Sequence, residues 1–331
     1  HAGRRQACHT GSRCINQTEH PGSRLQSARA VDGMRILRTE DSRFRDLPDF
    51  PYPPQFTDVG TDTPLRLHYV DHGPAAAAPV VLLHGEHGWS YLYRHMIPPL
   101  AGAGLRVLAP DLIGFGKSDK PESQEDYSFE KHLNWLEKWL LSLDLNNITL
   151  VCQNRSSLLA LALVMRQPER FRRIIAANAV IPRAEQDHAP VSGLWQMFAR
   201  YSPWFPVPQL IQLGTTRPLS RTELAAYDAP FPDDRYKAGA RSFARALRRH
   251  HKDLNRQRLW RFLEGWQKPF ITCFSDSDAG TRGGHRPLQR RIPGALGQPH
   301  VTLSGGHFLQ EDASDSFARV IIDACRPSLA A

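Results

Sequence analysis

The chain has 331 residues, of which 41% are hydrophobic and 23% are charged. These proportions are sufficient for a packed core and argue against a disordered chain. Lys and Arg outnumber Asp and Glu by 42 to 33, and no apolar run approaches the roughly 18 residues that a membrane-spanning helix needs. Five cysteines are too few for a disulfide scaffold and are typical of a reducing compartment, so we expect a cytoplasmic protein.

Residues 1–33 differ in composition from the rest of the chain. They hold five arginines, no lysine and only two acidic residues, Glu19 and Asp32. The segment shows neither helical nor strand periodicity, and it has no apolar centre of the kind found in a secretory signal. We therefore expect a disordered or non-native leader, followed by a folded chain that begins at Met34.

From residue 64 onwards, short β-branched runs alternate with helical patterns. The predicted strands lie at 80–83, 105–109, 148–152, 174–177, 270–274 and 301–303, and the clearest predicted helices lie at 129–140 and 157–166. This alternation predicts an α/β fold in which helices flank a mostly parallel sheet. Ligands of such folds bind beyond the carboxyl ends of the strands.

Residues 184–262 interrupt this alternation with helical and Pro-rich pieces. We expect them to form a helical cap over the strand ends, so that 34–183 and 263–331 make up the core. The basic run from Arg245 to Arg261 is interpreted as a solvated helix face. It lacks the stacking aromatic residues and the known module that nucleic-acid binding requires, so we expect neither a nucleic-acid nor a membrane partner.

The segment Cys152–Ser157 follows a predicted strand and precedes a predicted helix. A nucleophile elbow at such a turn needs small residues two before, two after and three after its central residue, because strand and helix approach closely there. Only Asn154 at the centre meets this condition, with Cys152, Ser156 and Ser157 as its neighbours. Asn also tolerates positive φ. The alternative is an ordinary strand-to-helix turn that contains Asn.

Two further residues follow in the chain order of α/β-hydrolases, which is nucleophile, acid, histidine. Asp278 comes after the predicted strand 270–274, and His307 comes after 301–303 and two glycines. Asp278 would orient the imidazole of His307. The loop His84–Glu86 could offer backbone N–H groups to an anion. The spacing of His84 and His87 fits no known zinc motif, so we expect no metal and no cofactor.

Longer strings of sequence resemble the haloalkane dehalogenases. They are His84–Glu86, Trp89–Pro98, Pro110–Pro121, Tyr227–Pro232 and Gly305–Glu311, and the resemblance extends from Met34 to about residue 325. The resemblance implies an α/β-hydrolase core with a helical cap. It also implies that an Asp displaces halide to form an alkyl-enzyme ester, which a His-activated water then hydrolyses. The partners would be a small halogenated organic substrate, halide and water, and we expect a monomer.

The chain departs from this family at the elbow. Asn154 stands where the family has its nucleophilic Asp, and Arg155 stands where it has its first halide-binding Trp. The resemblance leaves Asn154, Asp278 and His307 as the catalytic set. Glu86, Arg155 and Trp195 would contact substrate or halide, although Trp195 could equally be ordinary packing of the cap. We expect weak or no dehalogenation, because an amide is a far poorer nucleophile than a carboxylate.

Four other interpretations remain open from sequence. His307 and Asp278 could hydrolyse the Asn154 amide and so regenerate a carboxylate. Arg155 resembles the cation that follows the nucleophile in haloacetate dehalogenases, and could favour a haloacid through bidentate pairing. The chain could be a non-catalytic pseudo-enzyme that binds small anions. It could also be a decayed copy without a selected function.

Overall fold

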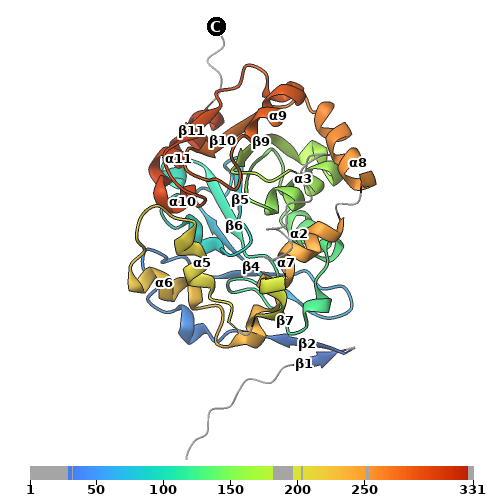
Figure 1. Cartoon of the computed structure of the whole chain (residues 1–331), viewed down its shortest axis with the longest axis vertical. Helices are drawn as coiled ribbons and strands as arrows, with labels where there is room; N and C mark the ends of the chain where they lie inside the picture. The colour runs from blue at the N-terminus through green and yellow to red at the C-terminus, as the bar shows by residue number, and fades with distance from the viewer. Residues whose placement is uncertain (1–28, 32, 182–196, 203, 251–252, 327–331) are drawn as a thin grey trace, which may run out of the picture.

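An eight-stranded sheet passes through the molecule, and helices flank it (Figure 1). The computed structural model describes residues 29–31, 33–181, 197–202, 204–250 and 253–326. In spatial order the strands of this sheet are β11 (Val301–Leu303), β10 (Phe270–Ser275), β9 (Phe171–Ala177), β8 (Ile148–Gln153), β5 (Pro79–Leu83), β6 (Arg106–Pro110), β4 (Arg66–His72) and β3 (Gln55–Asp58).

The six strands from β11 to β6 are parallel, whereas β4 and β3 continue the sheet in antiparallel orientation. The six parallel strands correspond to the six predicted from sequence, so the predicted α/β fold is confirmed. The two antiparallel strands were not predicted. Polar residues interrupt the apolar run of β4, and most of the short β3 is exposed, so neither presents a clear buried pattern.

The two central strands place the predicted site loops next to each other. All five residues of β5 and all six of β8 are buried. Continuous apolar burial is typical of parallel strands that are covered on both faces. Because β5 and β8 are hydrogen-bonded neighbours, the loop His84–Glu86 and the residue Asn154 follow adjacent carboxyl ends.

The two helices that were predicted at 129–140 and 157–166 begin and end close to their predicted bounds. Helix α2 (Phe129–Ser142) starts after Ser128, whose side chain accepts the N–H of Lys131 and caps the first turn. Helix α3 (Ser156–Arg166) follows β8 almost at once. The other helices of the core are α1 (Ile97–Gly102), α9 (His285–Arg291), α10 (Leu309–Asp312) and α11 (Ser314–Cys325).

Between β9 and β10 the described residues form helices and no strand. They include α5 (Val207–Leu213), α6 (Arg221–Asp228), α7 (Ala238–His250) and α8 (Asp253–Glu264), and residues 197–201 are helical as well. Helix α8 packs on α3, and the predicted cap boundary after residue 262 falls inside it. The boundary at 184 lies outside the described residues, so the division into core and cap stays a prediction, and we use the word cap for the described residues between β9 and β10. No helix in the described part of the chain is long and apolar enough to cross a membrane.

The basic run of the cap is not uniformly solvated. The guanidinium of Arg245 lies 2.8 Å from the carboxylate of Glu125, and its side chain is only 13% exposed. Arg258 and Arg261 on α8 are exposed, as the interpretation of a solvated face required. Arg245 therefore links the cap to the segment before α2.

A second, small sheet lies at the beginning of the described chain. It joins β1 (Arg29–Val31), β2 (Met34–Leu37) and β7 (Lys120–Pro121) in antiparallel pairs. Strand β1 belongs to the predicted leader, so three residues that were expected to be disordered take part in a sheet. Strand β1 has only three residues, which is too short for a side-chain period to appear in the sequence. Residues 1–28 lie outside the described residues.

Candidate active site

Only two residues, Asn154 and Arg155, separate the end of β8 from the start of α3. Asn154 has φ of 56° and is 7% exposed. Its carbonyl oxygen accepts the N–H groups of Ser157 and Val180, each at 3.2 Å. The chain therefore makes a tight turn with one residue in the left-handed region, a conformation that Asn adopts more easily than most residues. This is the backbone geometry that the steric argument from sequence placed at Asn154.

The surroundings of the turn are small or closely packed. Cys152, Ser156 and Ser157 are fully buried between strand and helix. A Cβ at Gly85 would lie 2.6 Å from Oε1 of Gln153 and 3.2 Å from Cβ of Asn154. Glycine at position 85 therefore lets the loop after β5 lie directly against the turn.

The side chain of Asn154 is held by the turn itself. Its Oδ1 accepts the backbone N–H of Arg155 at 2.5 Å. A backbone donor at this position can stabilise negative charge on an oxygen bound to the γ-carbon of residue 154. In an ester formed on a carboxylate at this position, the same N–H would face the acyl oxygen.

His307 and Asp278 form a hydrogen-bonded pair. Nδ1 of His307 lies 2.7 Å from Oδ2 of Asp278. The carboxylate also accepts the hydroxyl of Thr281 at 2.7 Å and the N–H of Gly280 at 2.9 Å. Burial opposes ionisation of Asp278, but the hydrogen bond and charge of His307 and these two donors hold its pKa below the usual value. An ionised Asp278 favours the tautomer with its proton on Nδ1, which leaves Nε2 to accept a proton from water.

The main chain of His307 is fixed from both sides. Its N–H donates to the carbonyl of Gly214 at 2.7 Å. Its carbonyl accepts Nε2 of Gln153 and Nδ2 of Asn178, each at 3.0 Å. Sequence reasoning missed these three residues. A polar residue directly after a buried strand, as Asn178 is after β9, was the available signal.

Arg155 is paired with Glu86. Its Nε lies 3.1 Å from Oε2 of Glu86, whose side chain is 4% exposed, whereas the side chain of Arg155 is 29% exposed. The sequence suggested a positive charge facing the cleft, with the backbone near Glu86 offering an N–H. The structure instead places the two side chains against each other, so the charge of Arg155 is compensated.

His87 belongs to the same group of charges, although it was not among the predicted site residues. Burial lowers its pKa; the negative charge of Glu86 raises it, while His307 and Arg155 lower it further. A neutral imidazole therefore lies beside the ion pair of Glu86 and Arg155. Its ring centre lies 6.0 Å from that of Phe205, which precedes α5, so the cap contacts the loop after β5 here.

Trp195, the predicted halide contact from the cap, lies outside the described residues, and its role stays a prediction.

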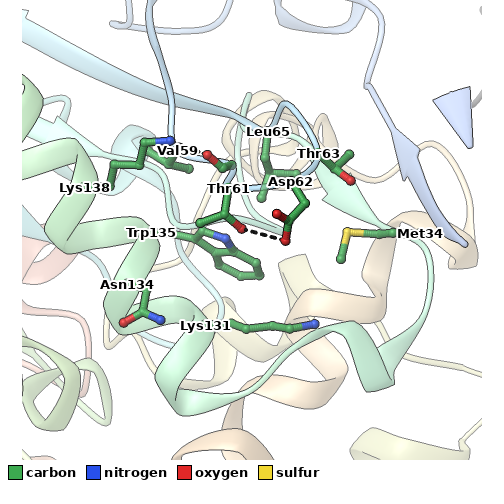
Figure 2. A pocket seen from close by; sticks show the side chains of 11 residues that line it. Met34, Val59, Thr61, Asp62, Thr63, Leu65, Lys131, Asn134, Trp135 and Lys138 are labelled. Atoms are coloured by element: carbon green, nitrogen blue, oxygen red, sulfur yellow. Dashed lines mark hydrogen bonds between the residues drawn. The ribbon is translucent and has the colours of Figure 1, made fainter. Parts of the chain in front are cut away.

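The structure also has a pocket of about 340 Å³ away from these residues. Figure 2 shows it between α2, which contributes Lys131, Trp135 and Lys138, and the turn that follows β3. None of the predicted site residues lines this pocket, so it is separate from the candidate active site.

Comparisons with known proteins agree with this geometry. The family described as alpha/beta hydrolase fold matches residues 78–314. A haloalkane dehalogenase from Psychrobacter cryohalolentis is 48% identical over 295 residues, which are 87% of this chain and 97% of that protein. One from Mycolicibacterium paratuberculosis is 46% identical, with coverage of 87% and 98%. Among solved structures, the tetrameric haloalkane dehalogenase DpaA from Paraglaciecola agarilytica NO2 is similar with a TM-score of 0.80 and 34% identity, covering 89% of this chain and 99% of that one. The chain therefore belongs to the haloalkane dehalogenases of the α/β-hydrolase fold.

Proposed function

We propose that this dehalogenase-like hydrolase keeps the half of its site that activates water and has lost the half that attacks carbon. The observation that carries the proposal is the position of Asn154, at φ of 56° in the turn between β8 and α3. The family mechanism needs a carboxylate at this point, and an amide carries no charge for the attack. In other hydrolases, loss of the nucleophile reduces kcat by roughly 10⁴ to 10⁶.

The pair of His307 and Asp278 supports the other half of the proposal. An imidazole held by an ionised carboxylate can take a proton from water as that water attacks an ester. The negative charge that develops on the acyl oxygen would lie at the N–H of Arg155, which is where Oδ1 of Asn154 lies now. Hydrolysis of an ester at position 154 would then return a free carboxylate and release an alcohol.

The test compares halide release from short bromoalkanes by the unmodified chain, by Asn154→Asp, and by Asn154→Asp with Arg155→Trp. We expect release only when position 154 carries a carboxylate, and faster release when Trp supplies an indole N–H to the halide. The same Asn-to-Asp change at the exposed Asn146 is the matched control and should produce no activity. If Asn154→Asp folds and releases no halide, the proposed roles of the elbow and of His307 are wrong.

A second possibility has its own support. Because the oxygen of the Asn154 amide accepts the N–H of Arg155 at 2.5 Å, its carbonyl is polarised for attack. Water activated by His307 would add to the γ-carbon, ammonia would leave, and residue 154 would become Asp. Peptide mass spectrometry after long incubation at neutral pH tests this, with His307→Ala as the control. An amide that persists unchanged would exclude self-conversion.

The haloacid and pseudo-enzyme alternatives depend on Arg155. A guanidinium that binds a substrate carboxylate would work best when no other acid compensates its charge, and here Glu86 lies 3.1 Å away. We therefore favour a haloalkane over a haloacid. Assaying haloacetates beside bromoalkanes with Asn154→Asp distinguishes the two substrates. Robust halide release by the unmodified chain would reject the pseudo-enzyme interpretation.

Domain boundaries, assembly and location also remain proposals. We propose a cap within 184–262, and a cytoplasmic location in keeping with the free thiols of Cys152, Cys273 and Cys325. We expect a monomer, although the similar dehalogenase from Paraglaciecola agarilytica is tetrameric. Light scattering after gel filtration gives the mass in solution and decides between one and four copies.

A further inference from the structure

A carboxylate outside the predicted site binds three backbone N–H groups at once. Asp312, the last residue of α10, accepts the N–H of Gly306 at 2.7 Å, that of Thr216 at 2.9 Å and that of Arg217 at 3.1 Å. Gly306 directly precedes His307, whereas Thr216 and Arg217 belong to the connection between α5 and α6. The side chain of Asp312 therefore joins the cap to the loop that carries the histidine.

A direct contact between backbones lies beside this carboxylate. The carbonyl of Gly214, at the end of α5, accepts the N–H of His307 at 2.7 Å and that of Phe308 at 3.2 Å. A Cβ at Gly306 would lie 2.6 Å from the Gly214 oxygen, so no side chain fits between the two segments. The cap thus touches the main chain of the histidine itself.

Buried ion pairs fix the helix that presents Asp312. The preceding residue, Glu311, accepts both terminal nitrogens of Arg94, at 2.5 and 2.9 Å, and also bonds to Tyr227 and Arg217. Arg94 in turn lies 2.7 Å from Glu223 of α6. These ion pairs therefore hold α10 against α6 of the cap.

The same cluster could be mistaken for a metal centre. His95, Glu223 and Glu311 each bring one ligand atom within 4.8 Å of the others. Both carboxylates, however, are already paired with the guanidinium groups of Arg94 and Arg217, so two negative charges are balanced by two positive ones. A divalent cation would meet two fixed positive charges there, and we assign the cluster to the structure of the cap contact.

We propose that Asp312 is a positioning residue for His307, and that the connection between α5 and α6 forms part of the support of the catalytic base. The proposal rests on the proposed function, in which His307 activates water for ester hydrolysis. Gln153 and Asn178 hold the carbonyl of His307, and Gly214 holds its N–H. Asp312 holds the N–H of Gly306, one residue before His307, which leaves the backbone little freedom to shift the ring away from Asp278. A misplacement of about 1 Å can reduce a rate by on the order of 10².

The first test separates the two chemical steps in the Asn154→Asp background. Asp312→Asn replaces one acceptor oxygen by an NH₂ group that would face backbone N–H donors. The matched control is Asp315→Asn, the same change at an exposed residue three positions further on. Rapid quenching and intact-protein mass spectrometry follow formation and decay of the alkyl-enzyme ester from a bromoalkane.

We expect ester formation to stay within about twofold, because the elbow that carries the new carboxylate does not contact Asp312. Ester hydrolysis should slow by roughly 10- to 100-fold, so that the alkyl-enzyme accumulates. Asp315→Asn should change neither step. Equal slowing of both steps, or hydrolysis as fast as in the parent, would overturn the positioning role.

A second test does not depend on activity. Hydrogen exchange of the unmodified chain should show a protected amide at His307, and Asp312→Asn should lose this protection while Asp315→Asn keeps it. If Asn154→Asp shows no turnover, the proposed function fails, but unchanged protection in Asp312→Asn would still refute the support of the histidine loop by Asp312. If Asp312→Asn does not fold, Asp312→Ser, which keeps one acceptor oxygen, takes its place in both tests.

Discussion

Replacement of the buried His132 should make the protein more resistant to acid. His132 lies on α2 and is 1% exposed, and neither ring nitrogen has a hydrogen-bond partner among the described residues. Its ring packs against Tyr127, Trp135 and Phe243. Burial in this aromatic setting, with a smaller effect of His84, lowers the pKa of His132 from 6.5 to about 3.

The pH dependence follows from this shift. The folded state holds a neutral imidazole, whereas the unfolded chain takes up a proton below pH 6.5, so stability is lost as the pH falls from 6.5 towards 3. At pH 5 the loss amounts to about 2 kcal/mol, because the pH lies about 1.5 units below the ordinary pKa and each unit corresponds to about 1.4 kcal/mol. At pH 7 the contribution is close to zero.

The substitution His132→Phe removes the titrating group and keeps a ring of similar shape. Urea unfolding at pH 7, 6 and 5 gives the free energy of unfolding of the variant and of the parent. We expect the difference between them to move in favour of the variant by about 2 kcal/mol from pH 7 to pH 5. The same substitution at the exposed His72 is the control. A difference that stays constant with pH would refute the assignment of a neutral, buried imidazole.

Two further predictions concern the site and its support. Gly85→Ala in the Asn154→Asp background should reduce stability by about 1–3 kcal/mol and abolish halide release, because the new Cβ would lie 2.6 Å from Oε1 of Gln153, which holds His307. Gly102→Ala, where a Cβ meets nothing within 4 Å, is the control, and equal activity in both variants would contradict the packing argument. Glu311→Gln should lower the free energy of unfolding by about 3–5 kcal/mol, because it leaves buried Arg94 undercompensated. The exposed pair of Glu264 with Arg291 should lose at most about 1 kcal/mol on Glu264→Gln, and a similar small loss at Glu311 would contradict the prediction.

The parallel strands of the sheet could be predicted because strands that are buried on both faces have unbroken apolar sequences. It also located the turn at Asn154 and the pair of Asp278 and His307, which lie 2.7 Å apart. The contacts of Arg155 could not be predicted in the same way. Whether its charge is free depends on Glu86, which lies 69 positions earlier in the chain and reaches it only because β5 and β8 are neighbours.

The supports of His307 were hidden for a different reason. Asn178, Gly214 and Asp312 bind backbone atoms in and next to His307. Nearly all residue types carry the same backbone groups, so the residue types around His307 do not indicate these partners. The sheet order explains where they come from. Asn178 follows β9 and His307 follows β11, so the amide of Asn178 reaches the main chain of His307 past the end of β10, which lies between these two strands.

The two halves of the site thus depend on largely different contacts. The turn at Asn154 depends on the close approach of Gly85 and on small residues between β8 and α3. The main chain around His307, the proposed base, is held by Asn178, by Asp312 and by the carbonyl of Gly214. Gln153 is the link between them, since it precedes Asn154 and donates to the carbonyl of His307. A change from carboxylate to amide at position 154 removes a charge without breaking any of these contacts. The geometry for activating water can therefore persist in a chain that lacks the nucleophile, which is why one substitution should be sufficient to restore turnover.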